Sequence, residues 1–334
     1  TVFGAGAWGS TMAQVLSDAG NDVLLWGRSQ QVIDEINSSH TNAKYLASHI
    51  LPSAITATTD LSLAFSFSEV YVLAIPAQQI RATLQEWKGN FSSTCTIVST
   101  LKGIEISSQK RMTEVIEDVL GPHKIAIITG PNLADELVLR QPAGAVAAAA
   151  TTELAESIRE LFRTPYYRVY TSVDVMGCEL AGSIKSVIAL AVGISIGMGF
   201  GENTQAMLIT RGLNEVARLC AAHGSDPLSA AGLAGMGDLV ASCGSPLSRN
   251  RTIGVYLGEG KTIDQAQALT RTTSEGVKSC QSILDLANRH GVEMPITEQV
   301  VNVIHHGTSA EKVLKAFMSR PTTAEEVNAL LKAA

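Results

Sequence analysis

Three glycines close to the start of the chain have the spacing of a phosphate-binding turn. The segment reads Gly4-Ala-Gly6-Ala-Trp-Gly9, follows the apolar pair Val2-Phe3 and precedes a helical pattern that stops at Gly20. In such a turn the first glycine permits the sharp bend, the second lets a pyrophosphate approach the backbone, and the third lets the helix pack on the strand. The motif therefore predicts that Gly4, Gly6 and Gly9 contact a dinucleotide. A glycine turn without a ligand is the alternative.

The residue at the end of the second predicted strand determines whether NAD or NADP is bound. A carboxylate there binds the ribose hydroxyls of NAD and repels a 2′-phosphate. This chain instead reads Trp26-Gly27-Arg28-Ser29. Because an arginine beside a hydroxyl suits a 2′-phosphate, we expect NADP(H) as the preferred cofactor, with NAD(H) as the alternative. A solvated surface arginine is the plain interpretation of Arg28.

Lys185 is the first candidate for proton transfer, because it lies in an apolar helical pattern with Ile184, Val187 and Ile188. An amine in such surroundings has a lowered pKa or finds a carboxylate partner. If the predicted dinucleotide is a nicotinamide that reduces a ketone by hydride transfer, the alkoxide that forms needs a proton donor at the oxygen. Lys185 is therefore predicted to be that donor. The alternative is a lysine that extends from a buried helix to solvent.

Two other charged residues lie in segments that suit a ligand-binding site. Lys102 follows a predicted strand at Thr96–Ser99, and doubly wound sheets bind ligands beyond the carboxyl ends of their strands. Asp238 lies in a glycine-containing segment and is predicted to orient Lys185 or to accept a hydrogen bond from a substrate hydroxyl. A helix N-cap ahead of Leu239 is the alternative role of Asp238.

The run Ser248-Arg249-Asn250-Arg251 is rich in hydrogen-bond donors. Two guanidinium groups, an amide and a hydroxyl within four residues match a dianionic phosphate. As an isolated tetrapeptide, the same run is typical of a solvated turn.

The elements that must position these residues follow from hydrophobic periodicity. Short apolar runs alternate with helical patterns up to about Thr129, which predicts buried parallel strands with covering helices. The predicted strands are Val2-Phe3, Val23–Trp26, Val70–Ile75, Thr96–Ser99 and Ile125–Thr129, with Gly144–Ala150 and Tyr166–Tyr170 as extensions. Long helical patterns follow Val173. We therefore expect an α/β fold, in which an N-terminal Rossmann-type, doubly wound, mostly parallel sheet (residues 1–180) precedes an all-helical C-terminal domain (residues 181–334). The apolar helices of the second domain need a substantial core or a subunit interface.

Composition limits the class of protein. The 334 residues are 46% hydrophobic and carry a net charge of −6, which argues against a nucleic-acid partner. The apolar stretch Ser186–Phe200 is shorter than the ~20 residues of a membrane span and predicts a buried helix. The five cysteines lie far apart and the seven histidines have no ligand spacing, so we expect free thiols in the cytoplasm and no metal. Thr1 lies only three residues before Gly4, so natural N-terminal residues are expected to be missing.

Five segments in order carry a more specific pattern than the glycine turn. They are Ser99-Thr-Leu-Lys-Gly103, Thr129-Gly-Pro-Asn-Leu-Ala134, Gly182-Ser-Ile-Lys-Ser186, Gly235-Met-Gly-Asp-Leu239 and Ser248-Arg-Asn-Arg251. With the glycine turn they extend over nearly the whole chain. In these segments the sequence resembles the NAD(P)-dependent glycerol-3-phosphate dehydrogenases of the bacterial type.

The resemblance implies a homodimeric cytoplasmic enzyme that reduces dihydroxyacetone phosphate to sn-glycerol 3-phosphate for phospholipid synthesis. It also implies that the helical domain (residues 181–334) binds substrate and forms the dimer. It places the general acid/base on Lys185 and a second active-site lysine on Lys102. The implied substrate contacts are Lys102, Gly130, Asn132, Lys185, Asp238, Ser248, Arg249 and Asn250. The implied cofactor contacts are Ala7, Trp8, Arg28, Lys102, Ala134, Arg249, Thr273 and Glu275. Asn132 stands where the family usually has serine or threonine, and Thr273 where it usually has valine; both retain the size needed.

Two other functions fit parts of the pattern. A β-hydroxy acid dehydrogenase of the hydroxyisobutyrate type has a similar architecture, but a lone carboxylate needs only one guanidinium fork, whereas Arg249 lies in a denser donor set. A dinucleotide-binding protein without catalysis would need neither Lys102, Lys185 nor Asp238.

Overall fold

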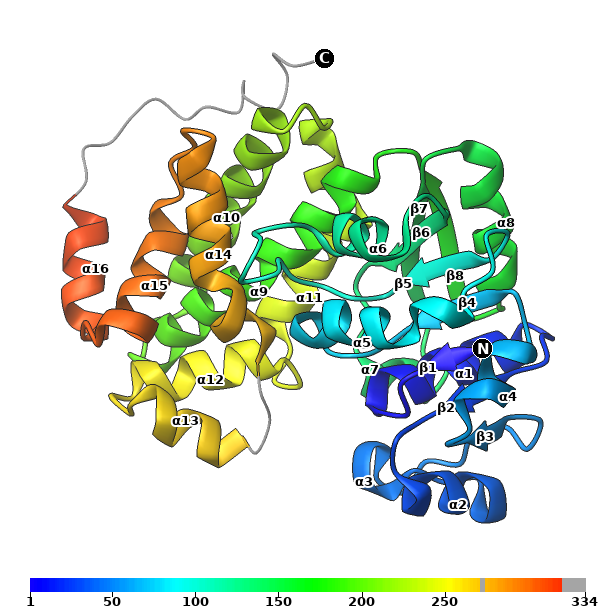
Figure 1. Cartoon of the computed structure of the whole chain (residues 1–334). Coiled ribbons are helices and arrows are strands. Elements are labelled where there is room, and N and C mark those ends of the chain that lie inside the picture. Colours follow the sequence, from blue (N-terminus) through cyan, green and yellow to red (C-terminus); the bar gives the residue numbers. More distant parts are fainter. Residues whose placement is uncertain (271–273, 320–334) are drawn as a thin grey trace. The chain divides into compact units, whose positions relative to one another are not determined.

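The chain forms two compact units in a computed structural model that describes residues 1–270 and 274–319 (Figure 1). The first unit consists of Thr1–Leu101 and Met112–Val175, and the second of Lys102–Arg111 and the chain from Met176 onward. The expected boundary after residue 180 falls inside helix α9 (Val175–Gly197), which continues through it without a break. The segment Lys102–Arg111 joins the second unit although both its chain neighbours belong to the first.

The first unit is built, in the described part of the chain, around an eight-stranded sheet with the order β3-β2-β1-β4-β5-β6-β7-β8. Neighbouring strands are parallel except β6 and β7, which are antiparallel. The strands are β1 (Val2–Phe3), β2 (Leu24–Trp26), β3 (Thr56–Thr58), β4 (Val70–Leu73), β5 (Thr96–Ser99), β6 (Lys124–Thr129), β7 (Ala143–Ala149) and β8 (Tyr167–Ser172). The first six strands have the order of a dinucleotide-binding sheet, whose direction of winding changes between β1 and β4. The predicted fold class is confirmed, whereas the short strand β3 was not predicted.

Successive strand residues point to opposite faces of this sheet and enter separate cores. Val72 and Val98 belong to one hydrophobic cluster, and Leu73 and Ile97 belong to another. Helices α1, α2 and α8 contribute to the first cluster, and α4, α5 and α6 contribute to the second. The helices of this unit are α1 (Ala7–Asp18), α2 (Gln30–Ser39), α3 (Ala43–Leu46), α4 (Leu61–Ser66), α5 (Ile80–Trp87), α6 (Met112–Leu120), α7 (Ala134–Leu137) and α8 (Thr152–Phe162). Burial on both faces explains why the strands have continuous apolar runs.

The second unit is helical and is organised around α9. It also contains α10 (Glu202–Ala222), α11 (Asp238–Gly244), α12 (Arg249–Gly258), α13 (Ile263–Thr270), α14 (Glu275–Arg289), α15 (Pro295–His306) and α16 (Ala310–Met318). Helix α9 is long and apolar enough to cross a membrane, but 83% of its most apolar window is buried inside the protein. This burial confirms the predicted buried helix.

Helices α9 and α12 approach each other through glycines on both sides. A Cβ atom on Gly193 would lie 2.1 Å from the carbonyl oxygen of Arg251, and one on Gly254 would lie 2.3 Å from that of Leu190. No side chain fits at such distances, so small residues are needed for this contact. The close packing sets the position of α12, which begins at Arg249, against the helix that carries Lys185.

Candidate active site

The glycine turn has the shape that its sequence predicts. Gly4 has a φ of +121°, and a Cβ atom there would lie 2.4 Å from the carbonyl oxygen of Ala74. A Cβ atom on Gly9 would lie 1.7 Å from the carbonyl oxygen of Gly4, whereas one on Gly6 would have no atom within 4 Å. Gly4 and Gly9 are therefore required by the fold itself, and Gly6 leaves open space above the backbone.

The start of α1 fits an anionic group. Gly6 is the N-cap residue and provides no side-chain cap, and the first turn contains no acidic residue. Ala7 and Trp8 begin the helix and are half-buried. The positive end of the helix dipole and the amide groups of this turn suit a pyrophosphate, and the space above Gly6 admits one. The turn thus fits the predicted dinucleotide.

Arg28 lies in the short connection between β2 and α2. Its side chain is exposed, and it makes no hydrogen bond or ion pair with any residue that the structure describes. Ser29 beside it is the N-cap residue of α2 and is also exposed. An exposed guanidinium without a protein partner can bind a phosphate without first losing an ion pair.

The segment after β6 contains the predicted contacts Gly130 and Asn132. Gly130 has a φ of +145°, which disfavours any residue with a side chain. In the orientation that satisfies both ends of its amide, Asn132 donates to the carbonyl oxygens of Pro131 and Gly144 and accepts a bond from the Tyr167 hydroxyl at 3.1 Å. Asn132 therefore connects this segment to β7 and β8.

Ala134, another predicted cofactor contact, is half-buried at the start of α7. With only a methyl group, it offers apolar contact and its backbone N–H but no side-chain hydrogen bond.

Asp238 brings two lysines together in the helical unit. Its Oδ2 atom lies 2.5 Å from Nζ of Lys102, and its Oδ1 atom lies 2.5 Å from Nζ of Lys185. The Asp238 side chain is 3% exposed, against 20% for Lys102 and 13% for Lys185. The carboxylate is thus the inner member of the cluster, and two ammonium groups share one negative charge. The three residues that were proposed from separate segments lie in one cluster.

The surroundings change the protonation of this cluster. Burial lowers the pKa of Lys185 to about 8; the charge of Asp238 opposes this shift, and that of Lys102 adds to it. Burial by itself would raise the pKa of Asp238, but the ammonium groups of Lys102 and Lys185 outweigh it and bring that pKa below its usual value. Near neutral pH Asp238 is therefore ionised, while Lys185 can gain or lose a proton.

The position of Asp238 depends on the unusual turn before it. Residues Leu233–Gly237 form a π-helical turn, a feature often found at functional sites. A Cβ atom on Gly235 would lie 2.0 Å from the carbonyl oxygen of Ala230, so the turn requires glycine. Gly237 is the N-cap residue and Asp238 is the first residue of α11, so the alternative N-cap role of Asp238 is wrong.

Ser242 belongs to the same cluster, although the sequence interpretation did not select it. Its Oγ atom lies 2.9 Å from Nζ of Lys185 and 3.4 Å from Oδ1 of Asp238. Residues four positions apart share a helix face, so its spacing from Asp238 was the signal that could have identified it.

The donor-rich run starts α12, and its members have different surroundings. Ser248 is the N-cap residue, whose side chain accepts a bond from the backbone N–H of Arg251. Arg249 is exposed and has no hydrogen bond or ion pair to the described residues. The Oδ1 atom of Asn250 accepts bonds from the backbone N–H of Gly276 and from the hydroxyl of Ser274. Arg249 is therefore available to an external anion, and Arg251 is half-buried with an Nε atom that has no hydrogen-bond partner among the described residues.

Glu275 is the first residue of α14, and its Oε1 atom would lie 2.8 Å from a Cβ atom on Gly103. This places Glu275 against the residue that follows Lys102. The predicted contact Thr273 lies outside the described residues.

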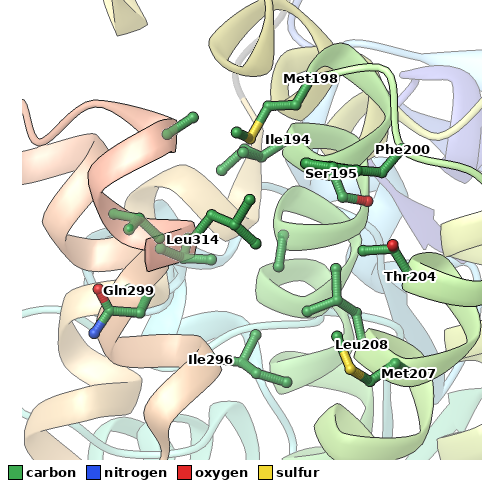
Figure 2. Close-up of a pocket in the computed structure, with 14 residues that line it drawn as sticks. Ile194, Ser195, Met198, Phe200, Thr204, Met207, Leu208, Ile296, Gln299 and Leu314 are labelled. Carbon is green, nitrogen blue, oxygen red and sulfur yellow. The ribbon is translucent and has the colours of Figure 1, made fainter. Parts of the chain in front are cut away.

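A separate pocket in the helical unit has a different character. Figure 2 shows Ile194, Met207 and Leu314 around it, and its walls come from α9, α10, α15 and α16. The cavity measures about 60 Å³, and none of its lining residues is charged. It has no group able to donate or accept a proton in catalysis and is distinct from the lysine cluster.

Comparisons with known proteins point to one family. The family model described as "NAD-dependent glycerol-3-phosphate dehydrogenase N-terminus" matches residues 1–155. The model described as "NAD-dependent glycerol-3-phosphate dehydrogenase C-terminus" matches residues 174–315. Curated proteins called glycerol-3-phosphate dehydrogenase [NAD(P)+], from Streptomyces avermitilis and Thermobifida fusca, are each 50% identical, covering 97% of this chain and 97% of theirs. The crystal structure of a glycerol-3-phosphate dehydrogenase from Coxiella burnetii is 32% identical, with a TM-score of 0.91 over 96% of this chain and 98% of that one.

Proposed function

This chain belongs to the NAD-dependent glycerol-3-phosphate dehydrogenase family, and we propose that it interconverts dihydroxyacetone phosphate and sn-glycerol 3-phosphate with a nicotinamide dinucleotide. The observation that carries this proposal is the buried Asp238 between the ammonium groups of Lys102 and Lys185. A cluster of one anion and two cations favours a substrate that is anionic and gains more negative charge during reaction.

The dinucleotide, when bound, supplies or accepts the hydride. Gly6 and the first amides of α1 bind its pyrophosphate. In the direction of ketone reduction, Lys185 donates a proton from Nζ to the substrate oxygen, and the reverse reaction returns the proton to Nζ. Asp238 and Ser242 hold Nζ of Lys185 in one orientation.

The remaining cations bind and orient the substrate. Lys102 places a second positive charge beside the carboxylate that holds Lys185, and this charge stabilises the developing alkoxide. Arg249 binds the phosphate through its fork of N–H donors, with Ser248 and Asn250 at the same helix start. Gly130 and Asn132 are proposed as further substrate contacts.

We further propose that NADP(H) is preferred over NAD(H). Support comes from Arg28, which has no carboxylate beside it in the sequence and no protein partner among the described residues. Lys102, Ala134, Arg249, Thr273 and Glu275 are proposed as the other cofactor contacts.

We also propose a cytoplasmic setting. The five cysteines are buried free thiols, which fits a reducing cytoplasm. Synthesis of glycerol 3-phosphate for phospholipids and assembly as a homodimer are proposed from the family resemblance. The burial of α9 within its own unit means that this apolar helix needs no partner subunit to cover it.

Spectrophotometry tests the proposal directly. We expect dihydroxyacetone phosphate to support oxidation of NADPH, and less efficiently of NADH. Unphosphorylated dihydroxyacetone should lose kcat as well as affinity, because binding of the remote phosphate orients the reacting carbon. A β-hydroxy acid dehydrogenase would instead turn over 3-hydroxyisobutyrate, and a binding protein without catalysis would turn over neither substrate.

A further inference from the structure

The loop Lys102–Arg111 is attached to the helical unit at points other than the Lys102 ammonium. The backbone N–H of Gly103 donates to Oγ of Ser183 at 3.0 Å. Ile104 is 1% exposed, belongs to the hydrophobic core of the helical unit, and forms an antiparallel bridge with Arg111. The start and the end of the loop are therefore fastened to each other and to the helices.

Ser183 has the right geometry to hold the loop at one place. Its side chain is almost completely buried, and its hydroxyl donates to the carbonyl oxygen of Glu179 at 2.8 Å. With its proton used in that bond, the oxygen presents a lone pair to the N–H of Gly103. Ser183 lies two positions before Lys185, so a single helix carries one lysine and anchors the backbone beside the other.

A buried ion pair anchors the far end of the loop. The Nη1 atom of Arg111 lies 2.6 Å from Oε2 of Glu179, and the two side chains are 13% and 5% exposed. Glu179 and Ser183 are four positions apart and therefore share a face of α9. Both ends of the loop are thus held by the same helix face.

We propose that Ser183 and the Arg111–Glu179 ion pair are positioning residues that hold the loop so that Lys102 reaches Asp238. This inference rests on the proposed function, because it assumes that Lys102 acts in the reaction. Gly103 has a φ of +145° and a Cβ atom there would lie 2.8 Å from Oε1 of Glu275, so the position beside Lys102 needs glycine. Because the bridge between Ile104 and Arg111 joins the two ends of the loop, we expect the loss of either anchor to displace Lys102.

The first test is Ser183→Ala, with Ser195→Ala as its matched control. Ser195 lies on the same helix, is also buried and also donates to a carbonyl oxygen of its own helix, that of Val192, but it does not contact the loop. We expect Ser183→Ala to lower kcat for dihydroxyacetone phosphate by about 10- to 100-fold, because small misplacements of reacting groups cost up to that much. Ser195→Ala should keep the wild-type kcat.

The pH profile separates loss of position from loss of stability. The charge of Lys102 lowers the pKa of Lys185. If Lys102 moves away in Ser183→Ala, the pKa of Lys185 should rise. The rate of ketone reduction should then begin to fall at a higher pH than in the wild type, as it should in Lys102→Met. A destabilised enzyme with Lys102 in place would keep the wild-type pH profile.

Variants of Arg111 provide an independent test if Ser183→Ala does not fold. Arg111→Lys keeps the positive charge opposite Glu179 and should retain most of kcat, whereas Arg111→Met should show the lower kcat and the shifted pH profile. Equal behaviour of the two variants would overturn the role of the ion pair.

The outcomes distinguish this inference from the proposed function. The proposed function would be contradicted if the wild-type enzyme did not reduce dihydroxyacetone phosphate. It would also be contradicted if Lys102→Met kept the wild-type kcat. The positioning role of Ser183 alone would be overturned by a different pair of results. Lys102→Met would have a lowered kcat, whereas Ser183→Ala and Ser195→Ala would have equal kcat values and equal pH profiles.

Discussion

The Nζ atom of Lys185 lies 2.5 Å from Oδ1 of Asp238, although the two residues are 53 positions apart in the chain. The other carboxylate oxygen is bonded to Lys102. Asp238 therefore holds both ammonium groups at one carboxylate, and its charge opposes the lowering of the pKa of Lys185. A change at Asp238 should therefore alter catalysis through its contacts with both lysines.

Asp238→Asn should lower kcat for ketone reduction by on the order of 100-fold, within the usual contribution of a placed acid or base. The amide has the size of the carboxylate but lacks the negative charge that opposes the lowering of the pKa of Lys185, so that pKa should fall below about 8. The pH at which reduction declines should therefore shift downward. Steady-state rates across pH measure both effects, with the exposed Asp226→Asn as control. An unshifted profile would contradict the coupling between Asp238 and Lys185.

Lys185→Met should lower kcat by on the order of 10²–10⁴-fold while dinucleotide binding persists. In the wild type, ketone reduction requires protonated Lys185, so its rate should fall as pH rises through about 8; alcohol oxidation requires the neutral amine and should rise over the same range. Both pH effects should disappear in the mutant. Circular dichroism checks the fold, and Lys261→Met serves as a surface control. Near-normal kcat with an unchanged profile would leave Lys102 as the candidate acid.

Gly6→Val should weaken dinucleotide binding by at least about 10-fold, or 1.4 kcal/mol. The first carbon of the new side chain meets no protein atom within 4 Å, so the loss should come from a blocked pyrophosphate and not from unfolding. Isothermal titration calorimetry measures the affinity. Gly89→Val is the matched control, because the space around Gly89 is also open. Tight binding by the Gly6 variant would refute the assignment of the turn.

Arg28→Asp should shift the cofactor preference from NADPH towards NADH by about 10- to 100-fold, the typical contribution of hydrogen bonds to charged groups. The new carboxylate would repel the 2′-phosphate and could accept bonds from the ribose hydroxyls of NAD. The ratio of kcat/KM for the two cofactors measures the shift, with the exposed Arg163→Asp as control. If the ratio stays the same, Arg28 is a solvated surface residue.

Arg249→Ala should raise the KM for dihydroxyacetone phosphate by about 10- to 100-fold at saturating cofactor. The activity towards unphosphorylated dihydroxyacetone should change little, because that ketone lacks the group that Arg249 binds. Arg289→Ala, a change of another exposed arginine in the helical unit, is the control. Equal losses with both ketones would show that Arg249 does not recognise the phosphate.

Local patterns were sufficient to predict much of this protein. The apolar runs that became β4, β5 and β6 were evident because strands buried on both faces need apolar residues throughout. The glycine turn was evident because Gly4, Gly6 and Gly9 lie close together in the chain. The short strand β3 was missed because Thr56–Thr58 is only three residues long and only its middle residue, Ala57, is buried.

The sequence also determined which chemical groups are available, but not their arrangement. Lys102 was expected at the edge of the sheet because it follows β5, yet its loop is bonded to α9 and belongs to the helical unit. The bond between Lys102 and Asp238 joins residues 136 positions apart, and Ser242 joins the same cluster. Periodicity reports contacts between near neighbours in the chain. Only the packing of whole helices, with glycines such as Gly193 and Gly254 allowing close approach, decides which distant side chains meet.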